Sequence, residues 1–416
     1  MTEKARRTAF WLVMLAAAGT FGLTMGARQS MGLFLSSLNT STGLGLGSIS
    51  LAFAFGQLWW GLTQPFAGAL ADRYGAGRVL VVGVILLCIG TFITPFMTST
   101  PGLILAIGVL ASGGSGMAGP AVLMSAAVRM IEPARRGFAT GLVNAGGSFG
   151  QFATAPLAAA LIVGMGWGSA MQVLAVMVLL ALPAAWVLRG SARQAAASAA
   201  AATPAAVPVR AETTREAIRR ALHTPGYLLL GAGFFVCGFH VAFIATHLPG
   251  VVAACQLPPA VGAWALAIVG LFNIVGSFAI GWAVSRWRMK SLLSLIYAAR
   301  GFAVLLFLFA PKTEAVVLVF AAVIGLTYLS TVPPTAGLVA KFFGTAHMAT
   351  LFGFVMLSHQ IGGFLGAWLG GKAFEWTGSY DWMWYADIVL AAGAALIHLP
   401  IREALVPPRV AAAAAA

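Results

Sequence analysis

The chain has 416 residues, of which 60% are hydrophobic and only 8% are charged. A soluble fold would need far more charge to cover its surface, so the composition indicates a polytopic membrane protein. The formal net charge of +14 would suggest nucleic acid if the basic residues gathered on one polar face, but they lie in short gaps between apolar runs. We therefore expect no nucleic-acid partner.

Apolar runs of membrane-spanning length recur along the whole chain. They predict an all-α fold of twelve transmembrane helices, near residues 10–35, 49–71, 79–97, 103–128, 138–163, 169–188, 227–252, 261–285, 292–310, 315–339, 350–372 and 383–400. The first run is too long for a signal peptide and lacks a cleavage site, so we expect it to be retained.

One long polar interruption divides these helices into six and six. We expect an N-terminal six-helix bundle at 1–190, a cytoplasmic central loop at 191–224, a C-terminal six-helix bundle at 225–402 and a cytoplasmic tail at 403–416. Within the loop, residues 213–222 read TTREAIRRAL and predict a short amphipathic helix at the inner surface.

The distribution of basic residues predicts the orientation. If both termini are cytoplasmic, 20 of the 24 Lys and Arg residues fall on the inner side, whereas only Lys312 and Lys372 fall outside. We therefore expect a multi-pass protein of the cell inner membrane.

Arg28 lies inside the first apolar run, where a cationic side chain is costly. Thr20, Thr24 and Arg28 recur every four residues and so share one helical face, which should point at an aqueous cavity or a partner. Alternatively, Arg28 extends to the outer headgroups or fills a backbone kink. Arg300 is the other arginine within a predicted helix. We expect Asp387 to open the last helix near the outer interface, where it could be the partner of Arg300 or a helix cap.

The two halves carry weak repeats of each other. A shift of 213 positions aligns Gly68-Ala-Leu-Ala-Asp72-Arg73 with Gly281-Trp-Ala-Val-Ser285-Arg286, and Pro120 with Pro333. These matches suggest two parallel halves with a site between them near mid-membrane.

The segment GALADRYGAGRVL, residues 68–80, closely resembles the signature loop of the major facilitator superfamily. The stretches GARQSMGLF (26–34), GFHVAFIATHLPG (238–250), GLVAKFFG (337–344) and SHQIGGFLGAWLGG (358–371) resemble its bacterial branch allied to monocarboxylate transporters and the oxalate/formate exchanger. The resemblance implies two six-helix bundles that rock about a central cavity.

The resemblance also implies an inner gate in which Asp72 bonds the start of helix eleven near Met348 to Thr350, favoured by the helix dipole, and pairs with Arg73 or Arg129. A solvated turn whose charges only set topology is the alternative. The gate residues that we expect are Gly68, Asp72, Arg73, Gly75, Arg78 and Arg129.

The sequence departs from the branch in helix eight, where better-known relatives hold the carboxylate with an arginine. Here that helix offers only Asn273 and Ser277, and helix eleven offers His359 and Gln360. Arg28 is therefore the expected anchor of an anion, through a bidentate guanidinium. The expected substrate-binding residues are Arg28, Gln57, Asn144, His240, Asn273, Tyr328 and Gln360. Each polar residue could instead form an interhelical hydrogen bond.

Histidine can bind and release a proton near neutral pH, so proton coupling would use His240, His247 or His359. Three scattered cysteines form no metal or disulfide pattern, and we expect no cofactor, no metal and no catalytic residue. The glycine spacing at Gly114 and the GGSFG segment around Ser148 lack the strand context of a nucleotide site or a hydrolase.

We therefore expect a monomeric secondary active transporter in the lipid bilayer that moves a small, monocarboxylate-like organic anion by proton symport or exchange. Efflux of a drug or other neutral metabolite is the alternative in the same class. A membrane-embedded hydrolase using Ser148 and a transport-dead sensor are alternatives of other classes.

Overall fold

The computed structural model describes residues 3–131, 136–189, 213–344 and 348–406. Within these ranges nearly all residues lie in helices and none lies in a β-strand. The predicted all-α membrane fold is therefore confirmed.

The described residues of the first half form fourteen helical segments, several of which join end to end into one span. They are α1 (Glu3–Gln29), η1 (Met31–Phe34), α2 (Leu35–Thr42), α3 (Leu46–Tyr74), α4 (Ala76–Ile93), η2 (Thr94–Phe96), α5 (Thr100–Leu103), the π-helical η3 (Ile104–Ala111), α6 (Ser112–Met117), α7 (Pro120–Arg129), α8 (Arg136–Met165), α9 (Trp167–Val178), η5 (Leu179–Ala181) and α10 (Leu182–Leu188).

The second half has fewer interruptions. Its helices are α12 (Thr214–Leu222), α13 (Pro225–Ala254), α14 (Pro259–Ala283), α15 (Met289–Phe309), α16 (Glu314–Thr327), α17 (Val332–Phe343), α18 (Met348–Thr377) and α19 (Asp381–His398). The predicted amphipathic helix is α12, which begins with a reciprocal cap: the Thr213 side chain accepts from the Glu216 amide, and the Glu216 carboxylate accepts from the Thr213 amide.

Ten helical stretches of the described residues are long and apolar enough to cross a membrane. The other two predicted spans correspond to α3 and α19, with 29 and 18 residues. At about 1.5 Å per residue, both approach or exceed the thickness of a bilayer core. The first predicted span differs in detail, because α1 ends at Gln29 and the chain turns before η1.

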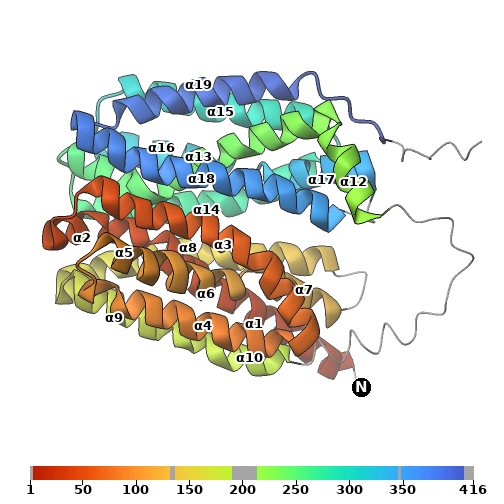
Figure 1. The fold of residues 1–416 in the computed structure, drawn as a ribbon, viewed down its shortest axis with the longest axis horizontal. Helices are drawn as coiled ribbons and strands as arrows, with labels where there is room; N and C mark the ends of the chain where they lie inside the picture. The colour runs from red at the N-terminus through yellow and green to blue at the C-terminus, as the bar shows by residue number, and fades with distance from the viewer. Residues whose placement is uncertain (1–2, 132–135, 190–212, 345–347, 407–416) are drawn as a thin grey trace, which may run out of the picture.

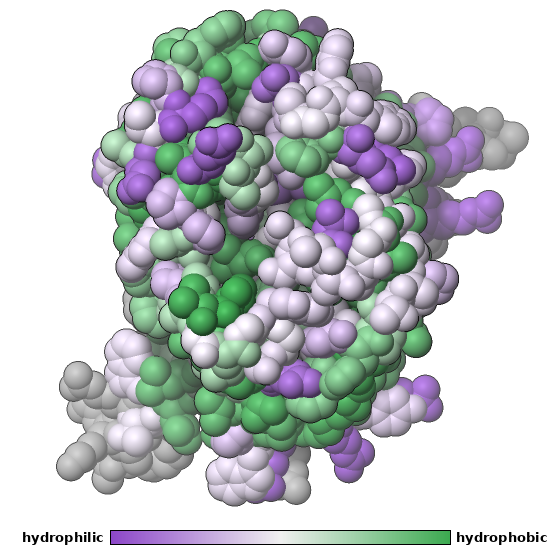
Figure 2. Space-filling model, turned by 90° about the vertical axis from the view of Figure 1, so that its left-hand side faces the viewer, coloured by the Kyte–Doolittle hydropathy of each residue, from purple (hydrophilic) through white to green (hydrophobic). Residues whose placement is uncertain are grey.

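The long helices run roughly parallel, with α1 to α10 in one group and α13 to α19 in the other (Figure 1). We call the end of the molecule that carries α2 the α2 end, and the opposite end, which carries α12, the α12 end. Figure 2 looks onto the α2 end, where hydrophilic side chains are scattered among weakly polar ones, as expected of helix ends that meet water.

Each group of helices has its own apolar core. One large cluster of buried side chains is built almost entirely from residues between Ala221 and Ile401, and two others lie between Val13 and Leu188. A small cluster of Ala54, Ala242 and Ala367 joins the two groups. We call the boundary between the two groups of helices, on which this cluster lies, the seam. Most of the polar residues discussed below lie along it.

Candidate functional site

Arg28 is positioned by the close crossing of α1 and α8. It lies in the last turn of α1, and a Cβ atom added to Gly26 would lie 2.6 Å from the carbonyl oxygen of Gly150. Small residues at such a crossing let the two backbones approach. This close contact holds the last turn of α1, and with it Arg28, against α8.

The neighbours of the Arg28 guanidinium are neutral. Its Cζ atom lies 4.5 Å from the centroid of the Trp60 ring, and Nη1 donates to Oε1 of Gln29 over 3.4 Å. No carboxylate in the described part of the chain forms an ion pair with it. A guanidinium has five N–H donors, and these contacts use few of them.

Two further donors, one in the Trp60 side chain that faces Arg28 and one on α18, are buried without an acceptor in the described part of the chain. Nε1 of Trp60 and Nε2 of Gln360 have no hydrogen-bond partner among the described residues. Gln360 on α18 lies directly against α3, because a Cβ atom on Gly61 would come 2.5 Å from its Nε2. Leaving a buried donor unpaired costs about 1–3 kcal/mol. These two donors and the positive charge of Arg28 therefore favour a ligand that only accepts hydrogen bonds, such as an anion.

A hydrogen-bonded path leads from Arg28 into the second group of helices. Nε2 of Gln29 donates to the Tyr328 hydroxyl over 3.4 Å, and that hydroxyl donates to the carbonyl of Val241 over 3.0 Å. Tyr328 is fully buried at the C-terminal end of α16. The anion-favouring region of α1 is thus joined to α13 and α16 through one tyrosine.

A second polar contact across the seam joins α8 to α14. Nδ2 of Asn273 donates to Oγ of Ser148 over 2.8 Å, and Oδ1 of Asn273 accepts from the Leu329 amide over 3.0 Å. Asn144 lies one turn before Ser148 on α8 and is half-buried. Gln57 lies one turn before Gly61 on α3 and is also half-buried. All the predicted substrate-binding residues except His240 therefore lie on the seam or at Arg28.

The seam is tight toward the α2 end. On α3 and α18, a Cβ atom on Gly371 would lie 2.8 Å from the Leu46 carbonyl oxygen. On α8 and α14, a Cβ atom on Gly270 would lie 2.8 Å from the carbonyl of Ser148.

Toward the α12 end the same helices separate. Gly68, Gly141 and Gly353 lie seven residues from Gly61, Ser148 and Gln360 and so continue the seam faces of α3, α8 and α18. Gly281 continues that of α14, because it lies eleven residues, or about three turns, from Gly270. A Cβ atom on any of these four glycines would meet nothing within 4 Å. The two groups of helices are therefore packed together at the α2 end and apart at the α12 end.

The three candidate histidines have different surroundings. Nε2 of His247 lies 2.7 Å from the Ala367 carbonyl, which it can satisfy as a structural donor. Nδ1 of His359 lies 3.1 Å from Oε1 of Gln360, its neighbour on α18. His240 contacts a charged cluster within the second group of helices.

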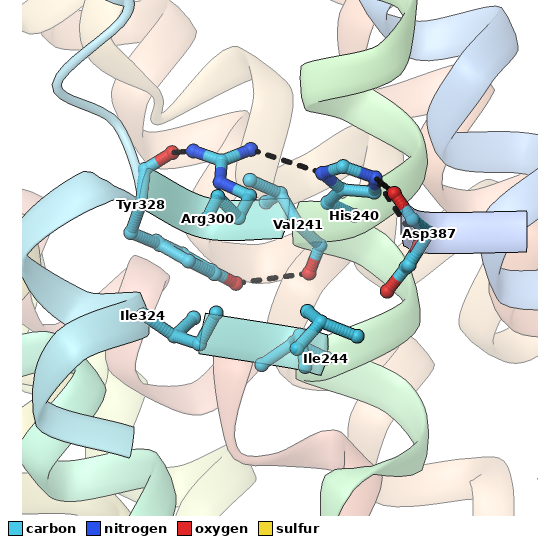
Figure 3. A pocket seen from close by; sticks show the side chains of 8 residues that line it. His240, Val241, Ile244, Arg300, Ile324, Tyr328 and Asp387 are labelled. Carbon is cyan, nitrogen blue, oxygen red and sulfur yellow. Dashed lines mark hydrogen bonds and ion pairs between the residues drawn. The ribbon is translucent and has the colours of Figure 1, made fainter. Parts of the chain in front are cut away.

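That cluster contains Arg300 and Asp387 (Figure 3). Nδ1 of His240 lies 3.5 Å from Nη1 of Arg300, and Nε2 of His240 lies 3.3 Å from Oδ1 of Asp387. Asp387 is only 1% exposed and lies inside α19, which begins at Asp381. The expectation that Asp387 opens the last helix is therefore wrong, and it meets Arg300 only through the histidine.

Part of the predicted gate lies outside the described residues. This holds for the side chains of Asp72 and Arg129, although α3 and α7 include their backbones. Gly75 has φ of 91°, a conformation that favours glycine, and its amide donates to the Ala71 carbonyl over 2.9 Å. Arg73 and Arg78 are exposed at the α12 end, where Arg73 lies 5.3 Å from the Tyr74 ring.

The sequence did not single out Trp60 or the position of Asp387. Trp60 follows Phe53 by seven residues, so the heptad spacing of α3 could have placed it on a buried face. The apolar run that follows Asp387 could have indicated that this residue lies inside the membrane. The start of a helix is uncertain from the sequence, however, so the depth of Asp387 in the helix could not be predicted.

Comparison with known proteins identifies the fold and its relatives. The sequence model of the Major Facilitator Superfamily matches residues 10–367 and 230–415. Monocarboxylate transporter 13 of Rattus norvegicus is 26% identical over 94% of this chain and 89% of its own length. The oxalate:formate antiporter of Oxalobacter formigenes is 23% identical over 89% of this chain and 87% of its own length.

Among solved structures, the crystal structure of a D-xylose-proton symporter covers 96% of this chain and 98% of its own, with a TM-score of 0.71 and 14% identity. At that identity the likeness concerns the fold alone. Together with the family match, it confirms the resemblance predicted from the segment at 68–80.

Proposed function

Since this chain belongs to the Major Facilitator Superfamily, we propose that it is a secondary active transporter of small organic anions of the monocarboxylate class. Arg28 would bind the carboxylate. The observation that carries the proposal is a half-buried arginine that has no acidic partner among the described residues and lies against Trp60, whose buried indole N–H has no acceptor there.

The chemistry of these donors suits a carboxylate. A guanidinium can hold two carboxylate oxygens through parallel hydrogen bonds, while the indole of Trp60 and the amide of Gln360 can donate to the remaining lone pairs. Two relatives, a monocarboxylate transporter and an oxalate:formate antiporter, support this substrate class. The site would be shaped along the seam by Gln57, Asn144, Asn273 and Tyr328. His240 would affect it indirectly, through its contact with Arg300.

Alternating access would follow from movement of the two groups of helices, which we take as bundles at 1–190 and 225–402. The tight α2 end and the separated α12 end support a state that opens at the α12 end. If the basic loops are cytoplasmic, as the positive-inside rule predicts, this state faces the cytoplasm. We propose a monomer in the inner membrane, with Asp72, Arg73 and Arg129 latching the α12 end in the opposite state.

The experiment is uptake of radiolabelled pyruvate, lactate and oxalate by proteoliposomes containing wild-type protein, Arg28→Lys or Arg28→Ala. A hydrogen bond to a charged group contributes about 1.5–3 kcal/mol, so Arg28→Ala should weaken anion affinity about 10- to 150-fold. Arg28→Lys keeps the positive charge but loses the planar guanidinium, so its affinity for the anion should lie between those of the wild type and Arg28→Ala.

Arg189→Ala provides the matched control, because Arg189 is exposed at the end of α10 and lies over the Trp186 ring. It should transport like the wild type. Unchanged uptake of all three anions by Arg28→Ala would contradict the proposed anchor. Binding of neutral drugs but of no anion by the wild type would favour the efflux alternative.

A further inference from the structure

The span from Glu314 to Phe343 is broken at its centre, where α16 ends at Thr327 and α17 begins at Val332. Pro333 and Pro334 follow the break, and a proline has no amide hydrogen with which to continue the helix. The last carbonyls of a helix have no partner within it, so those at the end of α16 need another donor.

Arg300 supplies that donor from the neighbouring helix α15. Its Nη2 donates to the carbonyl of Thr327 and, over 3.0 Å, to that of Tyr328. A cation at a helix C-terminus is stabilised by the negative end of the helix dipole. Tyr328 is thus held by its carbonyl to Arg300 and by its hydroxyl to Gln29 and Val241.

The other side of Arg300 faces His240. A guanidinium only donates hydrogen bonds, so Nδ1 of His240 must be the acceptor and Nε2 must carry the hydrogen. That hydrogen points at Asp387, whose backbone oxygen and Oδ1 lie 3.1 and 3.3 Å from Nε2 (Figure 3). The histidine is therefore held in one tautomer between a cation and a carboxylate.

The cluster has unused hydrogen-bonding capacity in a closed space. Among the described residues, the buried Nε of Arg300 has no hydrogen-bond partner, and the buried Oδ1 of Asp387 has the ion-pair contact with His240 but no well-aligned hydrogen bond. Both residues line a small cavity with His240 and Tyr328, and its free space of about 10 Å³ holds at most one water molecule. With Asp387 ionised and His240 neutral, the charges of Arg300 and Asp387 cancel.

We propose that Asp387, supported by His240, is a proton-binding site whose occupancy controls anion binding at Arg28. This inference rests on the proposed transport of anions. The proton adds to the Asp387 carboxylate from water on one side of the membrane and leaves to water on the other. His240 keeps its tautomer, because Arg300 occupies the side of Nδ1.

Protonation of Asp387 changes the net charge of the cluster from zero to +1. The uncompensated guanidinium then lies behind Tyr328, whose hydroxyl contacts Gln29 of the Arg28 region. A more positive potential there favours an anion, so proton and anion bind with positive cooperativity. This sign of coupling corresponds to symport.

Other titratable groups surround the cluster on the helices packed against it. Tyr297 on α15 lies with its ring 5.7 Å from Cζ of Arg300, and Cys237 on α13 lies 3.7 Å from the Tyr328 carbonyl. His359 reaches toward this region from α18. In the described part of the chain Asp387 is the acidic residue that contacts His240.

The experiment compares Asp387→Asn, His240→Gln and Asp387→Glu with the wild type in proteoliposomes. Asn keeps the shape of Asp387 but cannot ionise. A pH gradient that is alkaline inside should drive accumulation of pyruvate by the wild type and by Asp387→Glu. Asp387→Asn and His240→Gln should lose that accumulation, yet still exchange labelled for unlabelled pyruvate.

His398→Gln is the control, because His398 is a buried histidine on the same helix as Asp387 and its Nδ1 lies 2.6 Å from the Ala394 carbonyl oxygen. It should accumulate pyruvate like the wild type. Accumulation by Asp387→Asn and His240→Gln at the wild-type level would overturn the inference while leaving anion transport intact. A wild type that moves none of pyruvate, lactate and oxalate would instead overturn the proposed function.

A second readout needs no variant. Purified wild-type protein in weakly buffered detergent should take up protons when pyruvate binds, and a pH indicator would report the alkaline shift. If protonation of Asp387 raises the affinity for pyruvate, then binding of pyruvate must raise the affinity for the proton by the same factor, so protons are taken up. Binding of pyruvate without any pH change would overturn the inference.

Discussion

The two arginines within the membrane-spanning helices differ in what surrounds them. Arg300 is 2% exposed and is bound to two carbonyls, a histidine and, through it, a carboxylate. Arg28 is half-buried and meets an aromatic face and one amide oxygen. A buried cation must find compensation, so the comparison indicates that Arg300 is compensated by the protein, whereas Arg28 is left to be compensated by a ligand.

Replacing Arg300 should have the largest effect on stability. Arg300→Gln removes the donor to the Thr327 and Tyr328 carbonyls and the positive charge that faces Asp387 across His240. Leaving a buried charge uncompensated costs about 3–5 kcal/mol. Arg28→Gln removes a cation–π contact of about 1 kcal/mol, so substrate-free protein should unfold at nearly the wild-type temperature.

Thermal unfolding in detergent without substrate measures this difference, and a double substitution sharpens it. Arg300→Gln combined with Asp387→Asn leaves no unpaired charge, so it should recover part of the lost stability. If Arg28→Gln destabilised the protein as much as Arg300→Gln, the contrast between a structural and a functional arginine would be wrong.

The two ends of the seam provide a second contrast. At the α2 end Gly371 packs against α3, whereas Gly353 on the same helix meets nothing within 4 Å. Overpacking costs about 1–3 kcal/mol, which corresponds to about a 5- to 150-fold shift against the state closed at the α2 end. Gly371→Val should therefore slow pyruvate uptake, and Gly353→Val should not.

The initial rate of uptake measures this effect. Labelling of a cysteine at Ala54, a buried position on the same seam, by a membrane-impermeant thiol reagent should also increase in Gly371→Val. Equal effects of the two valines on rate and labelling would contradict the asymmetry of the seam.

The sequence predicted the fold well because a bilayer imposes a strong and simple pattern. Long apolar runs must become helices in which every backbone group is paired, so the positions of the spans followed from hydropathy. The glycine-rich segment at 68–80 then indicated the family, which the comparisons confirmed.

The site was less predictable, because hydropathy gives neither the rotation of a helix about its axis nor the depth of a residue. Arg28 was recognised because a charge in a span needs a reason. The role of Asn273 as a seam contact with Ser148, and the place of His240 between Arg300 and Asp387, depend on neighbours far away in the sequence. Periodicity within one helix cannot supply such neighbours.

The smallest effect that we predict tests the link between the two arginines. Tyr328→Phe keeps the carbonyl that Arg300 holds but removes the hydroxyl that joins Gln29 to Val241. Such a hydrogen bond contributes about 0.5–1.5 kcal/mol, so pyruvate affinity should fall only about 2- to 12-fold. The dependence of that affinity on pH should weaken as well, because the path from Asp387 to Arg28 passes through this hydroxyl. Calorimetric titration of pyruvate at several pH values would measure both. A Phe variant with weaker binding but an unaltered pH dependence would mean that the two arginines communicate through another route.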